Sequence, residues 1–359
     1  MSKKEGANKN IKSRAPTESD VAKVAGVSQS AVSRAFTPGA SVAQSTREKI
    51  LHAARSIGYQ PNLLARSLAT RRSNIIALAI SNLENPFYAQ VVKELSEQLA
   101  ETGRHILLFT TNAEEDENQA LEQALSYQVD ALVMAASKAS IELTMQCQKA
   151  GVPIVQINRE TRLPGISTVW GENQRAGELV AAFLHASKHE EYAFVAGTKD
   201  STISQMRQKG FIEYLSSVGK KDVKIVYGDY TFETAAIVAR QLLEVEKRPD
   251  AIFCASDYMA FAVIDVATRE FGLDVPNDLS VIGVDNVPES AHSAYDLTTF
   301  SQPAGSLVQE AIIIIDKMIA DPGRRAIRCE VAGDLIVRGS AKRPKTGFVN
   351  NVTNKIWLP

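Results

Sequence analysis

The sequence has few of the features that mark secreted, disulfide-bonded or membrane-spanning proteins. Its three cysteines, Cys147, Cys254 and Cys329, are odd in number, far apart and set in apolar stretches. This spacing offers neither a disulfide framework nor a metal-binding CxxC pair. No run approaches the roughly 20 consecutive apolar residues that a membrane-spanning helix needs, and the polar, basic start MSKKEGANKNIKSRAP has no apolar segment behind it. We therefore expect a cytoplasmic protein without a membrane partner.

The chain also lacks the short motifs of common enzyme classes. No GxSxG, HExxH, Walker A or GxGxxG sequence occurs between a predicted strand and a predicted helix. His185 and His189 lie four residues apart on a predicted helix, but no further ligand pattern joins them, so a solvated helix face is a simpler interpretation than a metal site. We predict a protein that is not an enzyme and that uses no metal or cofactor.

Charge is distributed unevenly along the 359 residues. The net charge is −1, yet residues 1–72 hold 13 Lys and Arg against 4 Asp and Glu, and the remainder holds 27 against 37. A disordered basic tail over residues 1–16 explains part of this excess, whereas Lys23, Arg34 and Arg47 stand among periodic apolar residues. A basic head on an acidic body is typical of a protein that binds a polyanion at one end.

Residues 17–58 predict three short helices. Their apolar residues recur at helical spacing, and the third helix stops at Gly58. Between the first two helices, Gly26 permits the positive φ that a sharp turn requires, and Ser28 can cap the second helix. The loop TPGASVAQST separates the second helix from the third. This arrangement predicts a helix-turn-helix unit.

The second helix has two distinct faces. One face is apolar and consists of Ala31, Val32, Ala35 and Phe36, and the other is polar and consists of Gln29, Ser30, Ser33 and Arg34. Gln29 and Ser30 lie at the N-terminal end, where a recognition helix presents side chains to base edges in the major groove, and Arg34 projects one turn later. The alternative is a helical hairpin with a solvated polar face. The basic charge and the turn residues favour DNA binding.

The remaining chain alternates short apolar runs with longer helical segments. Runs buried on both faces and separated by helices indicate parallel, doubly wound sheets, and their number exceeds one compact sheet, so we predict two similar α/β lobes. The predicted strands are 75–80, 105–110, 131–135, 153–157, 192–197, 224–228, 251–256 and 280–285, and the predicted helices are 87–101, 114–126, 175–187, 231–246 and 259–271.

Taken together, these segments resemble the lactose/galactose repressor (LacI/GalR) family of bacterial transcription factors. The resemblance begins with TESDVAKVAGVSQSAVSRAF and SVAQSTREKILHAARSIGYQPNLLARSLAT. It continues in order through NPFY at 85–88, VDALVMA at 129–135, GVPIVQINR at 151–159, RQKGF at 207–211, RPDAIFCASDYMA at 248–260, DVPNDLSVIGVDN at 274–286 and LTTFSQP at 297–303. It covers roughly residues 17–340, far more than any single motif.

The resemblance implies that residues 59–72 form a hinge that folds on operator DNA. Two hinges would pair in a dimer, and Leu68 would wedge into a central minor-groove step, which is physically reasonable because such a wedge bends DNA onto more protein surface. Leu63 and Leu64 could equally anchor the linker to the body. The predicted DNA-contacting residues are Ser28, Gln29, Ser30, Ser33, Arg34, Thr46, Asn62, Ala65, Arg66 and Leu68.

The body resembles the type I periplasmic sugar-binding fold, which implies an effector in the cleft between the lobes. Ligands of open α/β folds bind at the carboxyl ends of the strands. The family positions correspond to Phe87, Tyr88, Asn158, Arg159, Glu172, Arg207, Tyr230, Asp257 and Asp285. Aromatic faces with Arg and Asp suit a sugar or sugar derivative, with a purine as the alternative. Phe87 and Asp257 could equally be structural.

Three residues depart from the family pattern. Glu18 stands where an apolar residue usually begins the first helix, Ser256 replaces a common Asn, and Glu172 replaces a common Asp. The last two changes touch the predicted cleft, so the effector of a relative is not transferred to this chain. The tail AKRPKTGFVNNVTNKIWLP lacks a heptad repeat, so we expect a homodimer rather than a coiled-coil tetramer.

We therefore predict a dimeric transcriptional regulator, a repressor, that binds an inverted repeat in double-stranded DNA under control of a small effector. The alternatives are a solute-binding receptor, which would require export, and a nucleotide-dependent enzyme, which lacks its glycine motif. The expected segments are a tail at 1–16, a head at 17–58, a hinge at 59–72, an effector domain at 73–340 and a second tail at 341–359. Within the effector domain we assign about 73–172 and 303–326 to an N-lobe and about 173–302 and 327–340 to a C-lobe.

Overall fold

The computed structural model describes residues 15–37, 39–60, 72–110, 122–136, 140–161, 163–350 and 355–358. The chain divides into two compact units, Met1–Ser73 and Asn74–Pro359, and each is considered by itself. Most of the predicted N-terminal tail and of the predicted hinge lies outside the described residues, and so do four residues predicted to contact DNA, Asn62, Ala65, Arg66 and Leu68.

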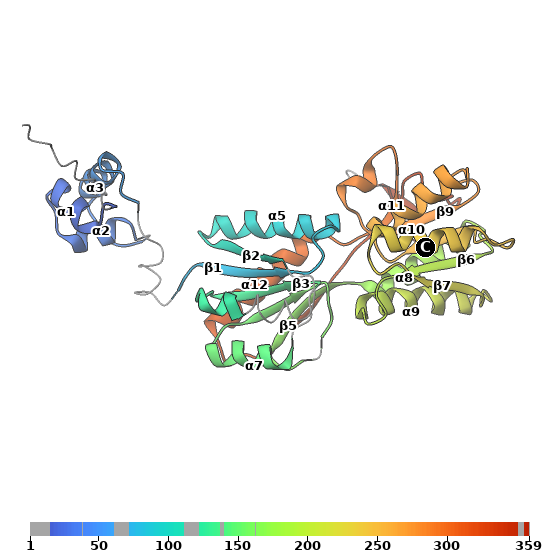
Figure 1. Cartoon of the computed structure of the whole chain (residues 1–359), viewed down its shortest axis with the longest axis horizontal. Coiled ribbons are helices and arrows are strands. Elements are labelled where there is room, and N and C mark those ends of the chain that lie inside the picture. The colour runs from blue at the N-terminus through green and yellow to red at the C-terminus, as the bar shows by residue number, and fades with distance from the viewer. Residues whose placement is uncertain are drawn as a thin grey trace, which may run out of the picture. The chain divides into compact units, whose positions relative to one another are not determined.

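The smaller unit contains the predicted helix-turn-helix. Its helices are α1 Glu18–Ala25, α2 Gln29–Ala35 and α3 Gln44–Ser56 (Figure 1). Before α1, the backbone N–H of Thr17 donates to the Asp20 carboxylate at 2.9 Å, which begins the helix with a reciprocal cap. Gly26 takes φ 62° after α1, the left-handed conformation that glycine adopts at little cost. Ser28 then caps α2 by accepting from the N–H of Ala31 at 3.3 Å.

A small core holds these helices together. Its buried members are Val21, Ala22, Ala25, Val32, Ala35, Ile50, Ala53, Ala54 and Tyr59, with Ala31 and Phe36 partly buried against them. The rings of Phe36 and Tyr59 lie 5.7 Å apart. The apolar face predicted for α2 therefore faces the other two helices, and the polar face is left to solvent.

In the larger unit, the first sheet has the strand order β11-β5-β4-β3-β1-β2. Neighbouring strands are parallel, as buried apolar runs linked by helices favour. The strands are β1 Ile75–Ile80, β2 His105–Thr110, β3 Ala131–Ala135, β4 Ile154–Ile157, β5 Ile166–Gly171 and β11 Arg328–Val331.

The second sheet has the order β13-β14-β12-β10-β9-β8-β6-β7. It is parallel from β7 through β10 and antiparallel beyond. Its strands are β6 Tyr192–Ala196, β7 Val223–Tyr227, β8 Ala251–Cys254, β9 Ser280–Asp285, β10 Thr298–Ser301, β12 Leu335–Ile336, β13 Phe348–Asn350 and β14 Lys355–Trp357.

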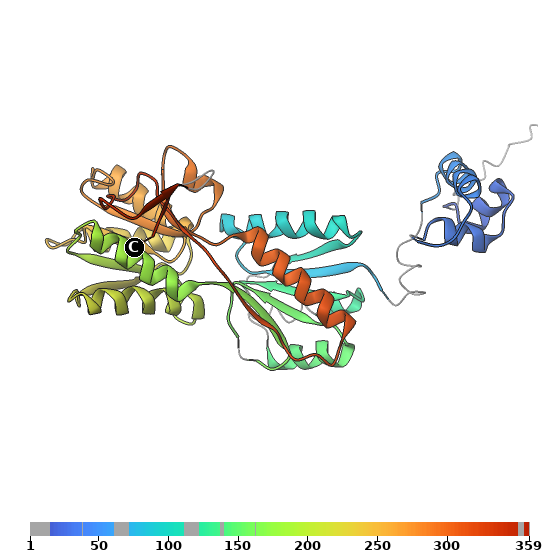
Figure 2. The same cartoon turned by 180° about the vertical axis from the view of Figure 1, so that it is seen from behind.

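Helices cover both faces of each sheet, as predicted (Figure 1). Helix α12 lies on the first lobe beside α5, although it is late in the sequence (Figure 2). The helices are α5 Pro86–Glu101, α7 Ile141–Ala150, α8 Asn173–Ala186, α9 Thr202–Ser217, α10 Phe232–Leu243, α11 Asp257–Asp265 and α12 Ala304–Ala320, with a π-helical turn at Val266–Glu270 and a 3-10 turn at Pro288–Ala291.

Within the described residues, the chain passes between the lobes after β5, after β10 and after β11. The last of these passages differs from the boundary that we predicted at residue 326. Strand β11 pairs with β5 of the first sheet, so the N-lobe extends to Val331, because backbone pairing with an edge strand, and not local sequence, decides where this segment lies.

The predicted C-terminal tail is also part of the second sheet. Strand β14 pairs with β12, and β13 pairs with β14. The Trp357 ring meets Phe183 of α8 edge-on at 5.4 Å, and its Nε1 donates to the Thr346 carbonyl at 2.9 Å. The last described residues therefore cover the edge of the sheet.

We expect Trp357→Leu to lower the free energy of unfolding by about 1–2 kcal/mol, because it removes a buried aromatic pair and leaves a carbonyl unpaired. Urea denaturation measures this change. Tyr227→Leu is the matched control, since Tyr227 is 37% exposed and its replacement should change stability little. Equal effects of the two substitutions would contradict a packing role for Trp357.

Candidate DNA-binding surface and ligand cleft

Helix α2 presents the predicted polar face to solvent. Ser28, Gln29, Ser30, Ser33 and Arg34 are all exposed, and Thr46 in the first turn of α3 is partly exposed. The hydroxyls of Ser28 and Ser30 lie 3.0 Å apart. Because the opposite face of α2 is fixed in the core, these side chains are held on a rigid support, which is what base-edge recognition requires.

A cleft of about 700 Å³ lies between the two lobes. Of the predicted effector residues, it brings together Tyr88, Asn158, Arg159, Arg207, Tyr230 and Asp285. They come from the first two turns of α5 and α9, from the segments that follow β4 and β7, and from the last residue of β9. This matches the expectation that the carboxyl ends of parallel strands form the ligand site.

Three of the predicted residues that line the cleft have unusual backbone conformations. Asn158, Tyr230 and Asp285 take φ values of 56°, 58° and 126°. Such values are uncommon for residues other than glycine and concentrate at functional sites, because surrounding packing must hold them in place. All three lie at or shortly after the carboxyl end of a strand, and all three line the cleft.

Arg207 is the buried cation of the cleft. Its side chain is only 1% exposed. Its Nε donates to Asn173 Oδ1 at 2.8 Å, and Nη1 donates to the Ala255 carbonyl. Its Nη2 has no partner among the described residues. Since a buried donor without a partner is costly, Nη2 is suited to bind an acceptor on a ligand.

Asp285 carries the buried carboxyl of the cleft. Burial raises the pKa of this carboxyl to about 8, while the nearby Arg207 charge lowers it. Its Oδ1 accepts from Gln302 Nε2 at 2.6 Å. A carboxyl in this state can accept from a ligand hydroxyl when ionised or donate to one when protonated.

The walls of the cleft are mostly neutral and polar. The Tyr230 hydroxyl and the Ser201 hydroxyl lie 3.1 Å apart, and the Tyr230 ring lies so close to Gly197 that a Cβ there would fall 2.0 Å from it. Burial raises the pKa of both Tyr88 and Tyr230, so both phenols are protonated. Asn158 Oδ1 is buried and has no partner among the described residues.

Three predicted effector residues lie outside this cleft lining. Phe87 is buried in the core of the first lobe. Glu172 bonds Arg175 Nη1 at 2.5 Å beside the passage from β5 to α8. The Asp257 carboxylate is fully enclosed and accepts from the hydroxyls of Ser290 and Thr299, each at 2.6 Å.

The cleft also contains polar residues that the sequence patterns did not single out. Asn82 Nδ2 reaches across from the first lobe to the Tyr230 carbonyl at 3.5 Å, and Ser201, Thr202 and Asp229 also line it. Asn82 follows β1 and Asp229 follows β7. Their positions directly after a strand could have indicated from the sequence that these residues lie near the cleft. Several polar residues follow each strand, however, so the sequence did not show which of them line it.

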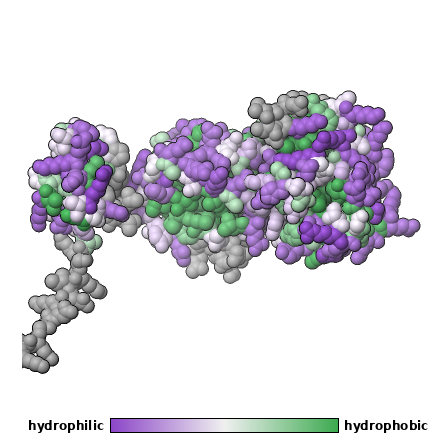
Figure 3. Space-filling view, turned by 90° about the horizontal axis from the view of Figure 1, so that it is seen from above, coloured by the Kyte–Doolittle hydropathy of each residue, from purple (hydrophilic) through white to green (hydrophobic). Residues whose placement is uncertain are grey.

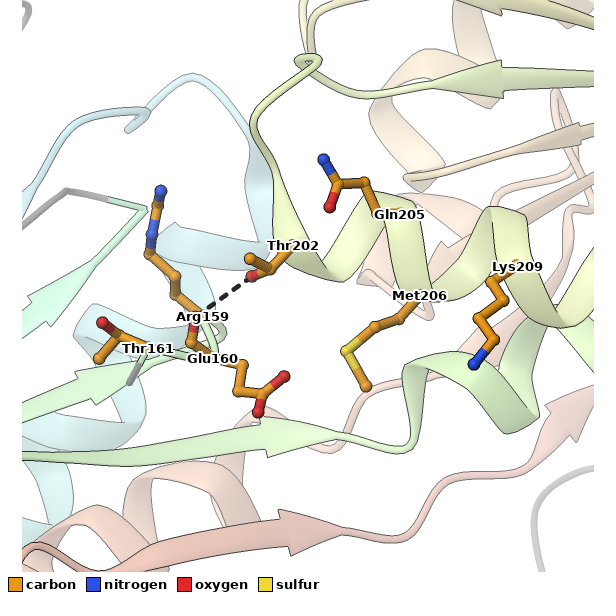
Figure 4. A pocket seen from close by; sticks show the side chains of 7 residues that line it. All are labelled: Arg159, Glu160, Thr161, Thr202, Gln205, Met206 and Lys209. Atoms are coloured by element: carbon orange, nitrogen blue, oxygen red, sulfur yellow. Dashed lines mark hydrogen bonds between the residues drawn. The ribbon is translucent and has the colours of Figure 1, made fainter. Parts of the chain in front are cut away.

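A smaller pocket of about 540 Å³ adjoins the cleft at Arg159 and Thr202. Figure 4 shows its lining, with residues 159–161 on one side and the first turns of α9 on the other. The Thr202 hydroxyl donates to the Glu160 carbonyl at 3.3 Å, and Arg159 Nη2 lies 3.9 Å from Asp200 Oδ2. These contacts join the two lobes at the rim of the cleft.

The described part of the chain contains no group of three or more His, Cys, Asp or Glu side chains placed to hold a metal ion. In the same residues, no helix combines the length and the apolar character that crossing a membrane requires.

Comparisons with known proteins agree with both parts of the chain. Residues 17–62 match the family "Bacterial regulatory proteins, lacI family", and residues 181–341 match "Periplasmic binding protein-like domain". The chain is 32% identical over 305 residues to the Catabolite control protein A of Priestia megaterium, covering 83% of this chain and 91% of that protein. It is 29% identical over 335 residues to the HTH-type transcriptional repressor CytR of Escherichia coli strain K12, covering 91% and 97%.

Solved structures have the same fold. The structure described as the transcriptional regulator CelR-cellobiose complex has a TM-score of 0.69 and 28% identity, covering 91% of this chain and all of that one. The lac repressor dimer bound to operator and the anti-inducer ONPF has a TM-score of 0.80 and 25% identity, covering 91% and 99%. These relatives are transcriptional regulators and not enzymes. The predicted fold and family are thereby confirmed, and the chain belongs to the LacI family of bacterial regulatory proteins.

Proposed function

We propose that this protein is a homodimeric transcriptional repressor that binds an inverted repeat in double-stranded DNA and responds to a neutral polyhydroxylated effector in the interlobe cleft. The observation that carries the proposal is α2, whose polar residues are exposed while its apolar residues are fixed in the core. A protein of this kind acts in the cytoplasm, where the DNA is.

A homodimer suits both the DNA and the surface of the larger unit. Two heads related by twofold symmetry match an inverted repeat. On the first lobe, the edge strand β2 leaves Leu108 41% exposed, and Figure 3 shows hydrophobic surface gathered on this lobe. An apolar patch with a polar surround is typical of a protein–protein interface.

The chemistry of the cleft favours a sugar, a sugar derivative or a nucleoside. Arg207 Nη2 and Asn158 Oδ1, a donor and an acceptor, are buried without partners, and Tyr88 and Tyr230 add hydroxyls and ring faces. The cleft lining holds the carboxyl groups of Glu84, Asp229 and Asp285 beside Arg159 and Arg207, so a strongly anionic ligand gains little. A ligand that prefers one lobe arrangement and a DNA site that prefers the other must weaken each other by the same factor.

Arg34→Ala tests the DNA half of the proposal. If Arg34 contacts a base, the variant should lose about tenfold or more in affinity for the preferred site and little for shuffled DNA, because one base contact is worth roughly 1–3 kcal/mol of discrimination. The site is selected from a random DNA pool with wild-type protein, and both affinities are measured by fluorescence anisotropy at fixed salt.

Arg55→Ala is the matched control, since it removes the same charge from an exposed position on α3. It should weaken binding to both DNAs alike. A uniform loss with Arg34→Ala would instead assign Arg34 to a phosphate, and equal wild-type affinity for selected and shuffled DNA would refute sequence-specific binding.

The effector half is tested with D-galactose, D-ribose, cellobiose and cytidine, and guanine tests the alternative, a purine base without a sugar. A compound that binds the cleft should raise the thermal midpoint of the protein and change its affinity for the selected DNA site. Compounds that raise the midpoint without changing DNA affinity would contradict the coupling.

A further inference from the structure

Two buried amide side chains lie behind Arg207 and Asp285 of the cleft. Asn173 is 1% exposed and Gln302 is 2% exposed, and neither lines the cleft. Asn173 begins α8 after the passage from β5, and Gln302 lies between β10 and α12. Each amide therefore belongs to a segment that connects the lobes.

Asn173 joins Arg207 to the first of these segments. Its Oδ1 accepts from Arg207 Nε at 2.8 Å, and its Nδ2 donates to the Gly171 carbonyl at 2.8 Å. The Asn173 Oδ1 atom thus orients the Arg207 guanidinium, and the Nδ2 atom is bonded to the passage between the lobes. An Asn side chain in this position is a rigid link because both of its ends are bonded.

Gln302 joins Asp285 to the same lobe passage at Gly171. Its Nε2 donates to Asp285 Oδ1 at 2.6 Å, and its backbone N–H donates to the Asp285 carbonyl at 3.2 Å. The side chain then lies against Gly171, where an added Cβ would fall 2.9 Å from Gln302 Oε1. The link from Arg207 through Asn173 and the link from Asp285 through Gln302 therefore both end at Gly171.

We propose that Asn173 and Gln302 are positioning residues that hold Arg207 and Asp285 from behind the cleft and connect both to the lobe passage at Gly171. This inference rests on the proposed function, since it concerns the same cleft. When a ligand bonds Arg207 Nη2 and the Asp285 carboxyl, these two side chains move. The two amides bonded to them then move the lobe passage at Gly171. Ligand binding then changes the angle between the lobes, because the segments that set this angle move with the ligand contacts.

The chain carries its own reporter of this passage. Trp170 precedes Gly171, and its Nε1 donates to Glu330 Oε1 of β11 at 3.2 Å, so its indole lies between two of the connecting segments. The sequence contains one other tryptophan, Trp357, which packs on Phe183 in the second lobe. In a ¹⁵N–¹H spectrum, Trp357 is therefore an internal reference for Trp170.

The first experiment needs no ligand. Asn173→Leu and Gln302→Met should move the indole N–H resonance of Trp170 and leave that of Trp357 in place. Asn173→Leu should also abolish the slow solvent exchange of the Arg207 Nε–H, whereas Asn173→Asp, which keeps an acceptor for Nε, should preserve it. Gln174→Leu is the matched control, because the side chain of the neighbouring Gln174 donates to the surface residue Glu213 at 3.4 Å and takes no part in either link. It should change neither signal.

The second experiment uses whichever of D-galactose, D-ribose, cellobiose, cytidine and guanine binds the wild-type protein. We expect Asn173→Leu and Gln302→Met to weaken that binding by about tenfold to a hundredfold, the usual worth of a hydrogen bond to a charged group. Affinity for the selected DNA site without the compound should stay within about twofold, and Asn173→Asp should recover most of the compound affinity.

Three results would overturn the proposal. They are wild-type compound affinity in Asn173→Leu, equal losses in Asn173→Asp and Asn173→Leu, and a Trp170 resonance that stays in place in both amide variants. If no compound of the set binds the wild-type protein, the proposed effector class fails, and the Trp170 and Arg207 signals still decide whether the amides hold the passage.

Discussion

Gly177→Ala should destabilise the protein by about 3 kcal/mol, although alanine is the better helix former. Helices α8 and α9 approach so closely that a Cβ on Gly177 would fall 2.0 Å from the Arg207 carbonyl oxygen and 2.8 Å from the Phe211 nitrogen. These are backbone atoms, so relief requires the two helices to move apart. On α9, a Cβ added to Gly210 would fall 2.0 Å from the Gln174 carbonyl oxygen. Urea denaturation measures the loss.

The separation of the helices should also displace Arg207, which lies on α9 at this contact. We therefore expect Gly177→Ala to lose effector binding under conditions where it is still folded. The matched control is Gly305→Ala in α12, where the added methyl meets only the flexible end of Glu94 at 3.1 Å. This substitution should be neutral or slightly stabilising. A Gly177→Ala protein as stable as the Gly305→Ala protein would contradict the close approach of α8 and α9.

Asp285→Asn should have opposite effects on stability and function. The folded protein keeps the Asp285 proton to a higher pH than the unfolded chain does, because burial raises the pKa of this carboxyl to about 8. The folded state therefore binds more protons between about pH 4 and pH 8, and the free energy of unfolding falls as pH rises through this window. At pH 8.5 the substitution should stabilise the protein by about 1–3 kcal/mol.

The effector response should be lost in the same variant, because an amide has one oxygen and one NH2 group in place of two oxygens that can both accept from a ligand hydroxyl or, when protonated, donate to it. Part of the pH dependence of stability should remain, because burial also raises the pKa of Asp257 to about 6, although the hydrogen bonds from Ser290 and Thr299 lower it. Asp222→Asn, at an exposed position, serves as the control and should leave the curve unchanged. Thermal midpoints between pH 4 and pH 9 provide the test, and a curve for Asp285→Asn that parallels the wild type would refute it.

Local sequence was sufficient to predict the helix-turn-helix and most of the parallel strands. The head is specified by short-range features, since Gly26 makes the turn, Ser28 caps α2, and the apolar spacing of α2 assigns its two faces. Strands β1, β3, β8 and β9 are continuous apolar runs because both faces of a parallel sheet are covered. Residues at the carboxyl ends of parallel strands, such as Asn158 directly after β4 and Asp285 at the end of β9, could therefore be placed at the cleft.

Helices and strands without a strong apolar pattern escaped prediction. Strand β5 includes Ser167 and Thr168, and α9 begins with polar residues around Gln205, so neither has the periodicity that identifies its kind. Strand β11 is only partly buried and gains its place by pairing with β5. Such edges are stabilised by backbone bonds to a partner far along the chain, which no local window contains.

The sequence by itself determined the family, the architecture, the two faces of α2 and most of the charged and aromatic residues that line the cleft. Each of these depends on neighbours within a few residues or on a long ordered resemblance. Only the tertiary structure separated Phe87, Glu172 and Asp257 from the cleft lining, and only it brought Asn173 and Gln302 together at Gly171. Two amides on different connecting segments have no sequence relationship. Their proximity exists only after both sheets have formed, when Asn173 comes within bonding distance of Arg207 and Gln302 within bonding distance of Asp285.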